Sequence, residues 1–82
     1  MKVEELKRIV ENHFENESDR KRVICVIGTA VVGLSRVEID INGATHWINQ
    51  FRAEFNRNAE FAGKYQACLK EVLRSEILFP VV

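Results

Sequence analysis

The stretch VICVIGTAVVGL, residues 23–34, decides how this chain folds. Apolar side chains recur from Val23 to Leu34 at three- and four-residue steps, which is the spacing of one helix face. Val26 and Val32 extend that face most of the way round the helix. Such a helix must be buried on nearly all sides, and a chain of 82 residues has few other helices to cover it. We therefore expect a second copy of the chain to complete the core.

Three other segments repeat their apolar residues at helical spacing. They are residues 2–16, 43–56 and 58–77, and they flank a central helix that we place at 19–35. The last two segments are joined only by Arg57-Asn58, which predicts a helical hairpin. The expected fold is all-α: a small three- to four-helix bundle in a single domain over residues 1–82, associated as a homodimer.

Polar residues mark where these helices should begin. Ser18 is the expected N-cap of the central helix and Asn42 or Asp40 that of the third segment, and the fourth segment is expected to start at Asn58 with Glu60 in its first turn. Between the second and third segments, residues 37–41 read as an extended or single-turn connector.

A strand interpretation of residues 22–41 is the alternative. Val, Ile and Thr favour strands, and Val37, Ile39 and Ile41 alternate ahead of the turn pair Asn42-Gly43. The helical stripe is longer than this alternation, and two strands alone would be marginally stable, so we favour the helix.

The core should contain the apolar residues that line the inner faces of these segments. They are Leu6, Ile9, Val10, Ile24, Ile27, Val31, Leu34, Trp47, Ile48, Phe51, Phe55, Tyr65, Leu69, Val72 and Leu73.

Composition excludes several classes of protein. Twelve basic and twelve acidic residues give a net charge of zero, which argues against a protein that coats nucleic acid. Apolar residues make up 46% and charged residues 29%, so intrinsic disorder is not expected. The longest apolar run has 12 residues where a membrane span needs about 20, and the first 22 residues carry six basic and six acidic groups rather than a secretory segment. We expect a cytoplasmic protein.

No pattern of residues predicts catalysis or cofactor binding. The two histidines and two cysteines are scattered singly, whereas a structural zinc site needs four such ligands close together. Gly28 and Gly33 do not have the spacing of a phosphate-binding loop. Cys25 and Cys68 are expected to be buried free thiols. We expect no catalytic residues, no metal, no cofactor and no enzyme activity.

Positive charge is densest at Arg20-Lys21-Arg22, although Asp19, Glu17 and Glu15 compensate it locally. This run would contact DNA or an acidic partner surface if it is functional. Arg52, on the third segment, would add to the same contact. The four residues assigned to it are Arg20, Lys21, Arg22 and Arg52.

A degenerate helix-turn-helix can be placed on residues 25–44. Thr29, Gly33 and Ile39 occupy the small, glycine and apolar positions of that motif. The second helix would be short and would carry Glu38 and Asp40, which phosphates repel. A DNA-binding regulator is therefore the rival interpretation.

The most C-terminal stretch, ILFPVV over residues 77–82, has no charge after Glu76. Burying such large apolar side chains stabilises by roughly 1.5–3 kcal/mol each. The stretch either folds back onto the chain's own helices or forms a strap across a second subunit. Small residues in the central helix would let the same helix of another copy approach closely, so Gly28→Leu is expected to disrupt the dimer. The residues assigned to the dimer or partner interface are Ile27, Gly28, Val31, Val32, Gly33, Leu78, Phe79 and Val81.

Residues 26–34, VIGTAVVGL, resemble a G-x-A-V-x-x-[IL] helix, followed by Asp40-Ile41-Asn42, by Trp47-Ile48 to Phe51, and by Val72-Leu73-Arg74. In this order the segments resemble the enterobacterial biofilm-development proteins of the YmgB/AriR type, over about residues 23–76. The resemblance implies a small all-helical homodimer that connects to two-component signalling in biofilm and acid resistance. DNA contact has also been proposed for that family, and it supplies no catalytic residues.

Together, these observations predict a non-enzymatic regulatory protein that acts by protein–protein interaction as a homodimer. We expect it to bind no cofactor and no membrane. The alternatives left open are the DNA-binding regulator and a phage-derived inhibitor of a host factor.

Overall fold

The computed structural model describes residues 2–75 of the chain, and these residues form helices joined by short connections without any strand. The all-α prediction is confirmed, and the strand alternative for residues 22–41 is wrong. The elements in chain order are α1 Lys2–His13, α2 Glu17–Val26, the π-helix η1 Ile27–Val31, α3 Arg36–Ile39, α4 Ala44–Arg57 and α5 Ala59–Arg74.

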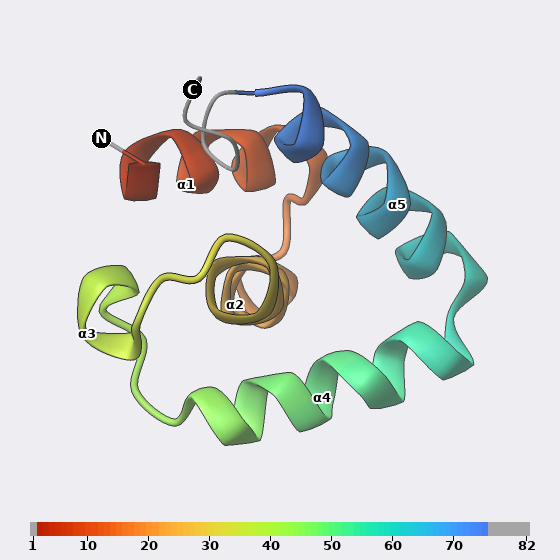
Figure 1. The fold of residues 1–82 in the computed structure, drawn as a ribbon. Coiled ribbons are helices and arrows are strands. Elements are labelled where there is room, and N and C mark those ends of the chain that lie inside the picture. The colour runs from red at the N-terminus through yellow and green to blue at the C-terminus, as the bar shows by residue number, and fades with distance from the viewer. Residues whose placement is uncertain (1, 76–82) are drawn as a thin grey trace.

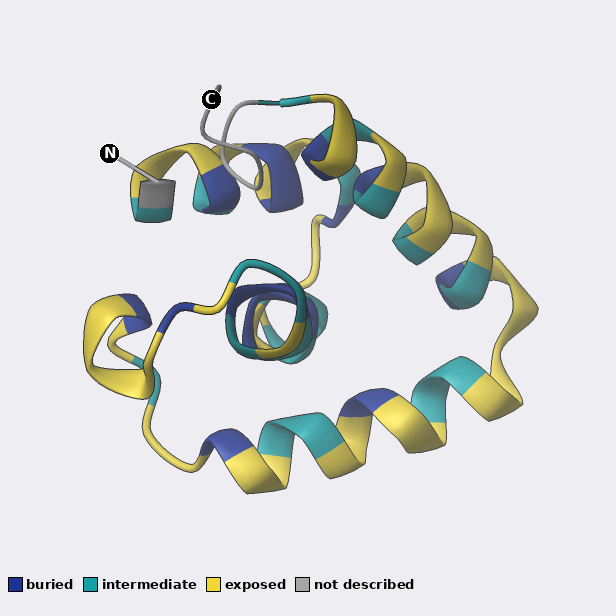
Figure 2. Ribbon diagram, in the orientation of Figure 1, coloured by how far each residue is buried: buried dark blue, intermediate teal, exposed yellow. Residues whose placement is uncertain are grey.

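The central helix, α2 continued by η1, passes through a ring made by the other elements. Figure 1 looks along α2, with α1, α5, α4 and α3 arranged around it. It packs on α4, α1 and α3, while α5 closes the ring by packing on α1 and α4. Figure 2 shows the buried positions turned toward this central helix.

This ring corrects the expectation that a second copy must complete the core. Val23, Cys25 and Ile27 have no exposed surface within one chain, and Val26 and Val31 are partly buried. Because each short helix contributes an apolar face to the same central helix, residues 2–75 cover most of it, while Ala30 stays exposed and Val32 partly buried near its end.

The central helix also ends earlier than predicted, because its last turn widens. Val32 N–H donates to the Ile27 carbonyl at 2.7 Å, the five-residue step of a π-helix, and the Thr29 hydroxyl donates to the carbonyl of Cys25. Gly33 then takes a left-handed conformation, φ 82°, which ends the helix.

Gly28 serves packing inside the chain. A Cβ at this position would lie 3.3 Å from Ile39 Cγ2 and 3.4 Å from Leu6 Cδ2. The missing side chain therefore lets α3 and α1 approach the central helix, which is the compensation for glycine within a helix.

Several predicted helix boundaries and caps are corrected. Helix α1 ends at His13, and Asn16 rather than Ser18 caps α2, with its side chain accepting from the backbone of Ser18 and Asp19. Helix α4 follows Gly43, which has a φ of 70° and no side-chain cap. The left-handed turn there replaces the cap expected from Asn42 or Asp40.

The predicted start of the last helix at Asn58 is confirmed, and the structure shows that the Asn58 side chain caps α5 by accepting from Glu60 and Phe61 N–H. Helix α5 ends at Arg74 rather than at residue 77. Its predicted connection to α4 through Arg57-Asn58 is also confirmed, although the two helices diverge in a V instead of lying alongside each other (Figure 1).

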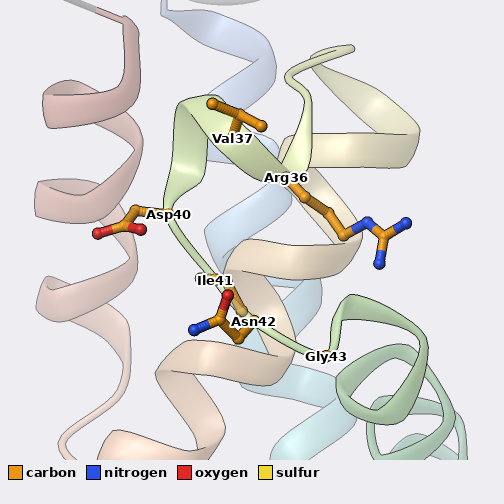
Figure 3. A pocket seen from close by; sticks show the side chains of 6 residues that line it. All are labelled: Arg36, Val37, Asp40, Ile41, Asn42 and Gly43. Carbon is orange, nitrogen blue, oxygen red and sulfur yellow. The ribbon is translucent and has the colours of Figure 1, made fainter.

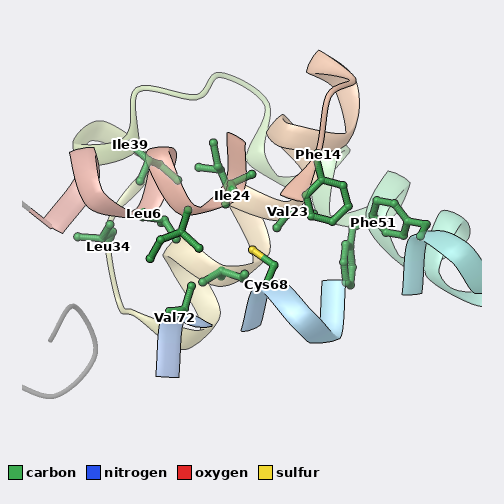
Figure 4. Packing of buried hydrophobic residues seen from close by; sticks show 13 residues of the cluster. Leu6, Phe14, Val23, Ile24, Leu34, Ile39, Phe51, Cys68 and Val72 are labelled. Carbon is green, nitrogen blue, oxygen red and sulfur yellow. The ribbon is translucent and has the colours of Figure 1, made fainter. Parts of the chain in front are cut away.

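Most of the predicted core lies in or against the buried cluster in Figure 4. Leu73 is the error: it is 42% exposed. Six predicted residues are only partly buried: Val31, Trp47, Ile48, Phe55, Tyr65 and Leu69. The prediction missed five buried residues: Phe14, Val23, Ile39, Ala44 and Phe61.

Candidate interaction surfaces

The connector between the central helix and α4, residues 35–43, forms a rigid corner that we name the α3 corner. Ser35 Oγ accepts from Glu38 N–H at 3.2 Å and the Glu38 carboxylate accepts from Ser35 N–H at 2.8 Å, which is a complete capping box. Ile39 is 1% exposed and anchors the turn in the core. The single-turn form of the predicted connector is therefore correct.

The outer side of the α3 corner carries apolar and charged groups with few contacts. Val37 is 88% exposed. The side chains of Arg36, Asp40 and Asn42 have no hydrogen-bond or ion-pair partner among residues 2–75. Together with Ile41 and Gly43 they line an open hollow of about 440 Å³ (Figure 3).

The backbone of this corner also departs from ordinary conformations. Asp40 ends α3 in the left-handed region, at φ 49° and ψ 49°, where Asp and Asn are several-fold enriched among residues other than glycine. Gly43, at φ 70°, is also left-handed, and both residues line the hollow.

The basic run Arg20-Lys21-Arg22 contacts groups of the chain itself. Arg20 Nε donates to the Phe14 carbonyl at 2.6 Å, and Arg22 Nη1 donates to Asp19 Oδ1 at 2.6 Å. Lys21 Nζ lies 3.8 Å from a carboxylate oxygen of Glu17 and 5.6 Å from the centre of the Trp47 ring. These pairings position α2 against the end of α1 and against α4.

Arg52 is exposed on α4 and borders a different, smaller hollow. This hollow has a volume of about 140 Å³ and lies between the central helix and α4. Its other lining residues are Val26, Ala30, Ile48 and Phe51. Arg52 therefore lies beside apolar side chains.

The predicted interface residues divide into three groups. Ile27 and Gly28 are buried against the chain's own helices and present no surface to a second copy. Val31 and Val32 are partly buried and Gly33 is exposed at the helix end. Leu78, Phe79 and Val81 lie outside the described residues.

The degenerate helix-turn-helix has a four-residue second helix, α3, and its apolar position Ile39 faces the core. A recognition helix presents its residues to base edges in the major groove, and α3 offers less than half the length of the other α-helices for that purpose.

Two cysteines and one histidine–carboxylate pair are the titratable groups of note among residues 2–75. Burial raises the pKa of the Cys68 thiol to about 12 and also raises the pKa of the Cys25 thiol, so both stay protonated at neutral pH. His13 Nε2 and Glu71 Oε1 lie 2.9 Å apart and link α1 to α5. Across residues 2–75 no three His, Cys, Asp or Glu side chains gather as metal ligands, and no helix there is long and apolar enough to cross a membrane.

Sequence reasoning missed the outer residues of the α3 corner. The S-x-x-E pattern of Ser35 and Glu38 was a readable signal for the capped turn. The exposure of Val37 had no sequence signal, because it depends on Ile39 turning inward toward Gly28.

Comparison with known proteins identifies no relative: no protein-family model, curated protein or solved structure matches the chain.

Proposed function

We propose that this protein is a non-enzymatic regulatory protein that acts by protein–protein interaction as a homodimer. The α3 corner is the observation that carries the proposal. It presents an exposed valine and three polar side chains that have no partner among residues 2–75, on a turn closed by a capping box. A rigid surface loses little conformational entropy on binding, so such corners suit contact with another protein.

The charge distribution supports this proposal over the DNA-binding alternative. DNA binding needs a surface with an excess of cations, whereas Glu17 and Asp19 pair with Lys21 and Arg22, and Arg36 is followed by Glu38 and Asp40, so neither region is uniformly basic. The narrower role of signalling connector rests on the sequence resemblance alone. It would be tested by biofilm mass and acid survival of a strain lacking the gene.

Sedimentation velocity of the full chain tests the homodimer. Between about 1 µM and about 1 mM the mass should rise from one copy to two. A mass of one copy at every concentration would overturn the homodimer. In parallel, fluorescence anisotropy with a labelled duplex should show no binding at low salt; tight binding that weakens as salt rises would favour the DNA alternative.

A further inference from the structure

We infer that two copies associate through the α3 corner, with Arg36 of each copy against Asp40 of the other and Val37 near the two-fold axis. This inference rests on the proposed homodimer and adds the surface and the pairing of charges.

The two charges flank Val37 and extend in opposite directions. In Figure 3 the Arg36 side chain points away from α1 and the Asp40 carboxylate toward it, where Asp40 also borders a hollow that Lys7, Arg20 and Lys21 help to line. Neither side chain has a hydrogen-bond or ion-pair partner among residues 2–75; Lys21, Lys64 and Arg57 are paired there, whereas the exposed Arg8, Arg52 and Lys70 are also unpaired.

A surface with one cation and one anion on opposite sides of a central point is complementary to itself. In a two-fold dimer the same patch faces its own copy, and each contact occurs twice. An axis that passes between Arg36 and Asp40, perpendicular to the line joining them, brings each arginine over the carboxylate of the other copy. Each corner therefore supplies one member of each of two ion pairs.

Apolar surface occupies the place where the two copies would meet. Val37 is the most exposed large apolar residue among those described, and the partly buried Ile41 lines the hollow beside it. Each copy's valine would cover the other's corner, and the hollow of about 440 Å³ has room for a side chain. Burial of this apolar surface gives the contact its attraction, while the charges set its orientation.

Charge reversal at Arg36 and at Asp40 tests the two ion pairs. Arg36→Asp places two carboxylates face to face, and Asp40→Lys places two cations face to face. Each variant alone should dimerise at least about tenfold more weakly than the natural chain. An equimolar mixture of the two variants places opposite charges in both pairs, so it should form a mixed dimer of nearly natural affinity.

Matched variants separate this pairing from a general effect of charge. Arg8→Asp and Glu15→Arg reverse exposed charges elsewhere and should leave the dimer unchanged. A lysine takes the left-handed conformation less readily than Asp, so Asp40→Asn is a second variant that removes the charge at less backbone cost. Far-ultraviolet circular dichroism checks that each variant is folded.

Sedimentation velocity distinguishes the outcomes. Weakened single variants and recovery in the mixture would support the inference. A natural dimer that none of these variants changes would overturn the α3 corner as its contact while leaving the homodimer intact. Single variants that weaken without recovery in the mixture would overturn the reciprocal pairing. A natural chain that is monomeric throughout would instead remove the proposed homodimer.

Discussion

The central helix and the α3 corner distribute apolar side chains in opposite ways. The central helix, Glu17–Val31, has the most apolar stretch of the sequence, yet it runs inside a ring of the chain's other helices (Figures 1 and 2). The α3 corner has an unremarkable composition, yet it leaves Val37 almost fully exposed. The surface available to a partner thus depends on which side chains the fold leaves uncovered, more than on which stretch is most apolar.

The difference between the two regions has a local cause. Gly28 lets Ile39 enter the core, and a helical turn that buries Ile39 must direct Val37 away from it. The same contact therefore covers the central helix and creates the exposed corner.

The strongest test of this contrast truncates one apolar side chain in each region. Ile27→Ala should destabilise the fold by about 2–5 kcal/mol, because Ile27 has no exposed surface and its loss leaves a cavity. Val37→Ala should change the free energy of unfolding by less than about 0.5 kcal/mol. Urea denaturation followed by Trp47 fluorescence, at a concentration where the chain is monomeric, measures both. Equal losses in the two variants would contradict the contrast.

Substitution of glycine tests whether Gly28 acts within one chain. Gly28→Leu should destabilise the monomer by about 1–3 kcal/mol, because even its Cβ would lie 3.3 Å from Ile39 Cγ2. This replaces the expectation from sequence that the variant would act on the dimer. The control is Gly63→Ala on α5, where no atom lies within 4 Å and a gain of about 0.5–1 kcal/mol is expected. If Gly28→Leu leaves the stability of the monomer unchanged, the expectation from sequence, that this glycine serves contact between two copies, would be favoured instead.

A change of pH tests how tightly the core around the central helix is closed. Burial raises the pKa of Cys68 from 9.0 to about 12. The unfolded chain therefore loses this proton first as the pH rises, and stability is lost from about pH 9 toward about pH 12. Between pH 8 and pH 10 the loss of stability assigned to this thiol is about 1 kcal/mol. Urea denaturation at both pH values should show that Cys68→Ala loses less free energy of unfolding than the natural chain. Equal losses in the two proteins would mean that the Cys68 thiol is accessible to solvent in the folded chain.

The helical class and most of the inner faces could be predicted because amphipathic periodicity depends only on neighbouring residues. Leu6, Val10 and Phe51 are buried as their spacing indicates. The path of the central helix could not be predicted in this way. Whether other helices of one chain surround it depends on their directions, which connections such as Gly43 determine.

The candidate site was less accessible to prediction than the fold. The basic run was correctly seen as locally compensated, but the contacts of Arg20 to the end of α1 and of Lys21 to Trp47 require the folded arrangement. The sequence indicated that Asp40 opposes DNA binding. It gave no sign that Arg36 and Asp40 would both lack partners on one exposed turn.

The smallest expected effect tests whether the α3 corner is held rigid by its own cap. Ser35→Ala removes the side-chain acceptor of Glu38 N–H and should cost about 1 kcal/mol. Hydrogen exchange of the backbone amides in residues 36–40 should accelerate while exchange in the central helix stays slow, because the loss is local. Ser18→Ala is the control: Asn16 caps α2, so this second serine should be replaceable with little effect. Unchanged exchange at the corner in Ser35→Ala would mean that Ile39 alone holds the turn, and the preorganisation argued for this surface would then rest on core packing rather than on the capping box.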